Sequence, residues 1–169
     1  MAGTSLSDIM EATKLAKGGI YGNFESKDEI CAESFLYLTE TLSQQLDRAV
    51  LRGETAKEKF SNLLNAYKGI KTEGGCPILN FGVEADDTHP GMKENVKKVI
   101  RASQKRFFDI LANGIASNEI SSDLDPKNFS IKVFAMIEGA ILCGRVLESS
   151  EQMEVVLDAI QDEFESYLI

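Results

Sequence analysis

The sequence lacks any run of apolar residues that approaches the roughly 20 needed to cross a bilayer as a helix. Its first ten residues, MAGTSLSDIM, contain no basic cluster followed by an apolar core, so they do not resemble a secretory signal. The hydrophobic share of 43% and the charged share of 27% are ordinary for a globular protein. A chain of 169 residues holds one large domain, or a small domain joined to a larger one.

Cysteine and histidine are scarce and scattered. Cys31, Cys76 and Cys143 are odd in number and far apart, which argues against a disulfide framework and favours a cytoplasmic location. Cys31 and Cys143 are expected to be small buried residues, and no neighbouring Lys or His supports a reactive thiolate at Cys76. His89 stands without a cluster at ligand spacing, so no metal site is expected.

Catalytic motifs are absent as well. The sequence contains no Gly-x-Ser-x-Gly elbow, no phosphate-binding loop and no dinucleotide-binding glycine pattern. We therefore expect neither an enzyme nor a bound cofactor.

Positive charge is in short supply. The net charge is −9, and residues 1–52 hold five Lys/Arg and eight Asp/Glu, a net of 5 − 8 = −3. Phosphate binding usually needs a basic surface. Any contact with DNA must therefore be local, made by Lys14, Lys17 and Lys27, by backbone N–H groups, or by residues upstream of Met1.

Helical periodicity dominates what the sequence does contain. Apolar residues recur at intervals of three and four along most of the chain, and no segment has a convincing strand pattern. The pattern predicts an all-α fold with about eight helices, at 5–13, 16–23, 26–52, 55–74, 78–85, 92–118, 125–147 and 151–167. The break before residue 16, followed by a helix of barely two turns, indicates a helix-turn-helix.

The segment Leu15–Ile30, LAKGGIYGNFESKDEI, resembles the recognition helix of the TetR family of bacterial transcription regulators. In that family the recognition helix ends in a Tyr-x-x-Phe pattern, here KGGIYGNF, and a lysine then opens the next helix, here SKDEI. The resemblance extends back through SLSDIMEAT and covers DLDPKN with the apolar helix that contains Glu138-Gly139-Ala140. GCPILNFGVEADDTHPG, at Gly75–Gly91, also resembles a segment from one branch of the family.

The sequence departs from the family pattern in two places. Thr13-Lys14 stands where members have Ala-Gly at the turn of the motif, so a non-glycine residue is expected to adopt positive φ. Members also carry a helix before the motif, and here that helix is missing from the sequence.

The resemblance implies a helix-turn-helix DNA-binding domain at 1–27, truncated at its start, and a helical ligand-binding and dimerisation domain at 28–169. The second motif helix is expected to lie in the major groove. The expected DNA contacts are Thr4, Lys17, Gly18, Tyr21, Asn23 and Lys27. From the spacing alone, the alternative interpretation is that Tyr21 and Phe24 are core residues and that Lys17 and Lys27 are solvated surface residues.

Aromatic and methionine side chains of the second domain suit an apolar or amphipathic effector of varied shape. The expected cavity lining is Tyr67, Phe81, Phe107, Phe108, Phe134, Met136 and Ile137, with an ordinary packed core as the alternative for each. The last two long helices are expected to pair with those of a second copy in a four-helix bundle that buries Ile141, Val156, Ile160 and Phe164.

The resemblance implies a ligand-responsive regulator, a repressor, that binds a palindromic operator as a homodimer and is released by a small molecule. Two alternatives stay open. The acidic motif half favours a helical dimeric interaction module that does not bind DNA, and a small-molecule carrier would bind ligand without any DNA response.

Overall fold

The computed structural model describes residues 3–70, 75–85 and 89–169. Within these ranges the chain forms eight α-helices, and the one β-type contact is an isolated bridge between Ile120 and Leu168. The predicted all-α fold class is confirmed. The helices are α1 Leu6–Thr13, α2 Lys17–Tyr21, α3 Lys27–Val50, α4 Ala56–Gly69, α5 Pro77–Ala85, α6 Pro90–Ala116, α7 Pro126–Val146 and α8 Glu151–Glu165.

Reciprocal side-chain caps fix the starts of α1 and α4. The Ser5 hydroxyl accepts a hydrogen bond from the Asp8 N–H at 3.1 Å, and the Asp8 carboxylate accepts one from the Ser5 N–H at 2.6 Å. Thr55 and Glu58 form the same pair at the start of α4. Each pair satisfies backbone donors that have no partner within the helix, so the sequence sets these two starts locally.

The cap of α3 is only half of such a reciprocal pair. The Ser26 hydroxyl accepts from the Glu29 N–H at 3.1 Å, but the Glu29 carboxylate accepts from the N–H of Glu25 instead of Ser26. The helix still begins at Lys27, as expected, and it ends at Val50.

Two apolar clusters form the core. The larger joins α4, α6, α7 and α8 around Phe60, whose ring centroid lies 4.0 Å from that of Phe164 and 5.9 Å from that of Phe107. The smaller lies where α5 packs against α3 and α6, and it contains Phe35 and Phe134. The expected extension of α4 to residue 74 is not observed, because α4 ends at Gly69; residues 71–74 lie outside the described part of the chain.

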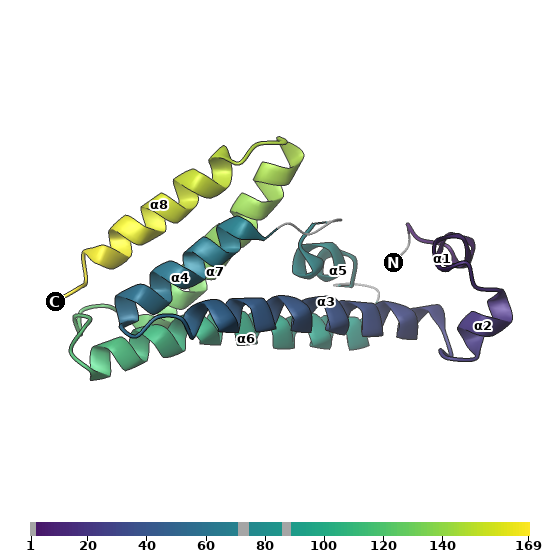
Figure 1. Cartoon of the computed structure of the whole chain (residues 1–169), viewed down its shortest axis with the longest axis horizontal. Helices are drawn as coiled ribbons and strands as arrows, with labels where there is room; N and C mark the ends of the chain where they lie inside the picture. The colour runs from purple at the N-terminus through teal and green to yellow at the C-terminus, as the bar shows by residue number, and fades with distance from the viewer. Residues whose placement is uncertain (1–2, 71–74, 86–88) are drawn as a thin grey trace.

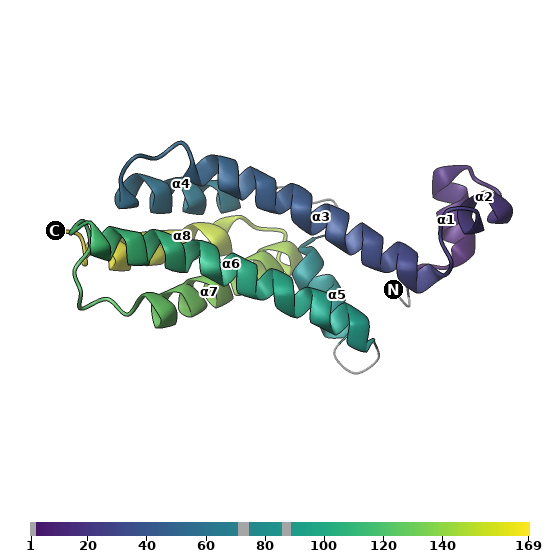
Figure 2. The same ribbon diagram turned by 90° about the horizontal axis from the view of Figure 1, so that it is seen from below.

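The helices place the motif and the C-terminus at opposite ends of the molecule. Figure 1 shows α3 and α6 running side by side along the long axis, with α1 and α2 at the free end of α3. Figure 2 shows the same end from below, where α1 and α2 stand beyond α5 and α6. No helix in the described part of the chain is long and apolar enough to span a membrane.

Candidate DNA-contact motif and effector cavity

Lys14 makes the turn between α1 and α2. Its φ of 57° and ψ of 22° lie in the left-handed region, so the positive φ expected here is confirmed. Thr13 supports the turn, since its hydroxyl donates to the Ile9 carbonyl at 2.7 Å and accepts from the Leu15 N–H at 3.4 Å. A left-handed conformation costs a non-glycine residue about 1–2 kcal/mol, so the rest of the motif holds Lys14 in place.

Helix α2 turns one side chain inward and the others outward. Ile20 is 3% exposed, whereas Tyr21 is 42% exposed and carries the Lys17 ammonium 5.8 Å from its ring centroid. A Cβ on Gly18 would meet no atom within 4 Å, so this face of the helix is open to a close neighbour. The Asn23 amide donates to the Gly19 carbonyl at 2.9 Å and closes the end of the helix. The core interpretation therefore fits Ile20 and the half-buried Phe24, but not Tyr21.

Thr4 and Lys27 flank this surface. Thr4 is exposed next to the cap of α1, and Lys27 is half-buried at the start of α3. The pKa of Asp8 is lowered, chiefly by the hydrogen bond from the Ser5 backbone and then by the Ser5 hydroxyl, with a small attraction from Lys27. Lys27 thus lies near α1 as well as α2, at the point where the motif joins the long helix.

Two cavities meet beside Tyr67 in the larger part of the molecule. One, of about 420 Å³, is lined by α3, α6 and parts of α4 and α7, including Leu42 and Ser103. The other, of about 280 Å³, lies between α4, α7 and the start of α8, and it includes Cys76 and Met153. Both sizes are close to those of small-molecule sites. A larger groove of about 650 Å³ is lined mainly by polar and charged side chains of α3, α4 and α6, so it suits an apolar ligand less well.

Among the side chains expected to line a cavity, Tyr67 does so in both. Phe107 lies behind it, with the two ring centroids 5.9 Å apart and the rings nearly parallel. Phe107 and Ile137 are fully buried in the larger core, and Met136 packs against that core from its edge. These three side chains belong to the packed core in this structure, which was the alternative to a place on the cavity wall.

The remaining expected lining residues lie elsewhere. Phe134 is buried in the smaller core, and Phe81 packs against it with its ring centroid 5.3 Å from that of Phe35. Phe108 is exposed on α6, because one residue along a helix turns the side chain by about 100° from the buried Phe107. The expected lining is thus corrected for these three aromatic residues.

Glu138 is a buried acid at the cavity walls that sequence reasoning did not single out. It borders both cavities, is 8% exposed, and its Oε2 atom has no hydrogen-bond partner among the described residues. Burial raises the pKa of Glu138, and a hydrogen bond from the Cys76 thiol partly offsets that rise. Burial raises the pKa of Cys76 to about 12, so the thiol is protonated at neutral pH, in agreement with the expectation that it is unreactive. The sequence signal that could have identified Glu138 is that it is the single acid within the largely apolar stretch FSIKVFAMIEGAILCGRVL.

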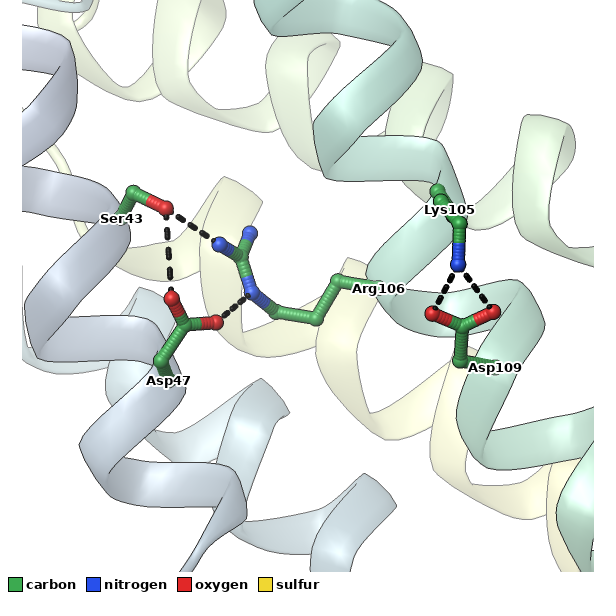
Figure 3. A network of polar contacts seen from close by, with 5 residues as sticks. All are labelled: Ser43, Asp47, Lys105, Arg106 and Asp109. Atoms are coloured by element: carbon green, nitrogen blue, oxygen red, sulfur yellow. Dashed lines mark hydrogen bonds and ion pairs between the residues drawn. The ribbon is translucent and has the colours of Figure 1, made fainter.

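Arg106 joins α6 to α3 on the wall of the larger cavity. Its Nε atom donates to an Asp47 oxygen at 2.7 Å, and its guanidinium also donates to the Ser43 hydroxyl at 2.6 Å. Figure 3 shows this bridge crossing between the two helices, while the neighbouring Lys105 and Asp109 pair with each other along α6 alone. The Arg106 side chain is 12% exposed, so the bridge is better shielded from water than the Lys105 pair.

The residues expected at a subunit interface divide into two groups. Ile160 and Phe164 are buried in the larger core of this single chain, so their side chains are not available to a second copy. Ile141 and Val156 are half-buried and pack against the same core. The large apolar side chains that α7 and α8 expose are instead Ile131, Leu142, Val146 and Val155.

The chain matches known proteins along most of its length. Residues 56–160 match the family model described as "Tetracyclin repressor-like, C-terminal domain". A TetR-family transcriptional regulator from Cytophaga hutchinsonii is 32% identical, with a TM-score of 0.90 over 99% of this chain and 86% of that one. A TetR transcriptional regulator from Chloroflexus aurantiacus J-10-FL is 31% identical, with a TM-score of 0.93 and the same two shares.

A curated relative agrees with the solved structures. An HTH-type transcriptional regulator in the lacX 3' region of Lactococcus lactis subsp. lactis is 22% identical over 168 residues, which is 96% of this chain and 84% of the relative. These matches are to regulators and not to enzymes. The family model covers more than half of the sequence and two solved relatives exceed 30% identity, so this chain belongs to the TetR family of transcriptional regulators.

Proposed function

We propose that this regulator binds an operator DNA as a homodimer through α1 and α2, and that a small molecule in the cavities beside Tyr67 lowers its affinity for the operator. One observation carries the proposal. Helix α3 holds the motif at its first residue, Lys27, and its later turns supply Thr39 and Leu42 to the wall of the larger cavity. A ligand and a DNA duplex would therefore act on the same helix.

The exposed face of α2 supports the DNA-binding half of the proposal. Lys17, Gly18 and Tyr21 point away from the buried Ile20, where a side chain or the backbone can approach a groove. Lys17 suits a phosphate or guanine contact, and the Tyr21 hydroxyl suits a phosphate. Asn23 already bonds the Gly19 carbonyl, so its amide has one remaining N–H to offer.

The exposed apolar residues of α7 and α8 support the dimer. Leu142 and Val146 follow Ile131 and the small residues Ala135 and Gly139 along one stripe of α7. Small residues allow two helices to approach closely, and a two-fold interface uses the same stripe twice. In a dimer of this kind the two recognition helices contact half-sites about one helical turn, or 34–36 Å, apart.

The test starts from operators that the full chain selects out of random duplexes. Affinity for the selected duplex at two salt concentrations should fall steeply with salt, with a slope of about −0.9 for each phosphate contact. Lys17→Ala should weaken binding and reduce that slope by about one, while Tyr21→Ala should weaken it as well. Lys127→Ala removes an exposed lysine in the first turn of α7 and serves as the matched control.

The net charge of −3 over residues 1–52 favours a second candidate, an interaction module that dimerises without DNA. That candidate predicts no selected duplex and no salt-dependent shift. A carrier would bind ligand with no effect on any DNA complex. Unchanged affinity in both Lys17→Ala and Tyr21→Ala would contradict the assignment of these residues.

Effector release is tested on the same complex. A ligand shifts an equilibrium only if it binds one state more tightly than the other. An effector should therefore lower operator affinity, and saturating operator should lower effector affinity by the same factor.

A further inference from the structure

Glu138 combines deep burial with an unsatisfied oxygen at the meeting point of two cavities. The Oε2 atom has no hydrogen-bond partner among the described residues, although less than a tenth of the side chain is exposed. A buried carboxyl without a complementary group is unfavourable, and an ionised one is strongly so. A residue of this kind in an otherwise apolar stretch of α7 needs a partner that the described residues do not supply.

Neither the group that bonds Glu138 nor Arg106 on the wall of the larger cavity supplies a strong hydrogen-bond donor to its Oε2 atom. The Cys76 thiol donates to the carboxyl group, but it is a weak donor. Arg106 borders the same cavity, yet Asp47 and Ser43 on α3 engage its guanidinium. The titratable groups that border either cavity besides Glu138 and Cys76 are Glu40, Tyr67, Lys68, Lys98, Arg106 and Arg145.

Apolar side chains make up much of the remaining wall. Leu42 borders both cavities, Leu36 and Val99 border the larger one, and Ile70 and Met153 border the smaller one. Tyr67 also borders both cavities, and an aromatic ring attracts a cation that lies over its face. Four basic side chains also border the two cavities, but the apolar part of the wall would suit an apolar body, and the unsatisfied Glu138 oxygen would accept a hydrogen bond from one positively charged donor.

The geometry points to Glu138 as the recognition group for an effector that carries a protonated amine on an apolar body, with an ammonium N–H donating to Oε2. This inference rests on the proposed effector site and adds the chemistry of its ligand. A carboxylate ligand would meet repulsion from Glu138, and a neutral alcohol would make a weaker hydrogen bond than an ammonium does.

The test compares three probes that share one chain and differ only in the head group: decylammonium, decanol and decanoate. Calorimetric titration of the full chain at neutral pH should show that decylammonium binds roughly tenfold or more tightly than either of the others. Equal affinities, tighter binding of decanoate, or no binding of decylammonium would overturn the inference. This comparison needs no variant.

Substitution then assigns the preference to one carboxyl group. Glu138→Gln keeps the shape of the side chain and removes its charge, so the preference for decylammonium over decanol should largely disappear while decanol affinity stays within about twofold. Glu40→Gln removes an exposed acid from the wall of the same larger cavity and should leave the preference intact. A Glu138→Gln chain that is folded by circular dichroism and keeps the preference would contradict the assignment.

The operator complex separates this inference from the proposed function. If decylammonium binds through Glu138 but leaves operator affinity unchanged, the recognition chemistry holds and effector release fails. If a different small molecule releases the operator equally from the wild type and from Glu138→Gln, effector release holds and the role of Glu138 fails.

Discussion

Lys14 occupies a backbone conformation that β-branched residues avoid. This preference depends on the shape of the side chain near the backbone and not on its charge. Its φ of 57° places it in the left-handed region at the turn of the motif. Asparagine tolerates this region better than most residues, whereas valine does not. The turn can therefore be tested apart from the charge.

We predict that Lys14→Val opens the motif more readily than Lys14→Asn does. Both substitutions remove the charge, so the difference between them reports the backbone alone. A difference of about 1 kcal/mol should lower the hydrogen-exchange protection of the Ile20 amide roughly fivefold in the valine variant. That amide donates to the carbonyl of Ala16, the residue that caps the start of α2. Equal protection in both variants would show that the left-handed turn does not limit the stability of α2.

Glu138 should make stability depend on pH in a defined direction. Its pKa is raised above the ordinary 4.5, chiefly by burial, so the folded state retains this proton more strongly than the unfolded state does. The stabilisation from the protonated group is complete below the unfolded pKa and is lost as pH rises through the folded pKa. Glu138→Gln, which resembles the protonated acid at every pH, should gain stability relative to the wild type as pH rises from about 4 to 8. Urea unfolding of both chains across this range measures the difference, and a constant difference would contradict the burial of an uncompensated acid.

Single-residue burial was the hardest feature to predict from the sequence. The pattern identified Phe107 and Phe108 together, yet one is in the core and the other is exposed. Cys143, expected to be buried, is exposed. Which face of a helix meets its neighbours depends on packing between elements, and a helix that is apolar nearly all round, such as α7, gives no directional signal.

At the scale of helices, the bridge from Arg106 to Asp47 and Ser43 fastens α3 to α6. The contact spans two elements, so it restrains their relative position, whereas the Lys105–Asp109 pair restrains only one helix. Asp47 is about half exposed, so solvent screens part of the attraction.

A double-mutant cycle with Arg106→Met and Asp47→Asn should give a coupling energy of about 0.5–1 kcal/mol in urea unfolding. The same cycle on Lys105 and Asp109 should give about 0.3–0.5 kcal/mol, as is usual for exposed pairs one turn apart. The proposed effector cavity is bordered by Arg106 and Ser43, so an effector should change the first coupling and not the second. If the two coupling energies are equal and neither changes when the effector is added, the bridge has no role in the response to the effector.

Helix starts were predictable wherever a capping residue precedes an apolar stripe, as at Ser5, Ser26, Thr55 and Asp125. The C-terminal ends of helices were less predictable, because a glycine allows a helix to end but does not force it to end there. Helix α4 ends at Gly69, several residues before the expected end at residue 74. The bridge from Arg106 to Asp47 joins residues 59 positions apart, a pairing that local patterns do not contain.

For the whole molecule, the exposed apolar stripe of α7 and the outer face of α8 are the proposed dimer surface. Leu142 is half exposed, and the stripe continues through Val146. The sequence pattern pointed to this same pair of helices, but among its expected interface residues were Ile160 and Phe164, which the core of a single chain already uses. A regular apolar stripe in the sequence does not show whether it packs against the core of its own chain or against a second copy.

We predict that Leu142→Glu weakens the dimer. Burying an unpaired carboxylate at an interface is unfavourable by several kcal/mol, so the dissociation constant should rise about 100-fold or more. Leu51→Glu changes another exposed leucine, at the end of α3, and should leave the dimer unchanged. Sedimentation equilibrium measures both, and an unaltered dimer in Leu142→Glu would place the interface elsewhere.

The length of α3 would convert a small rotation at one end of the helix into a larger displacement at the other end. Its 24 residues correspond to a rod of roughly 36 Å at about 1.5 Å for each residue. A pivot of only about 5° near its C-terminal end would sweep the opposite tip through roughly 3 Å, close to the 3.4 Å rise of one base pair. In the proposed dimer, two such helices tilting in symmetry-related directions would change the spacing of their tips by nearly two base-pair steps, so a small rotation near the pivot would become a mismatch with the DNA.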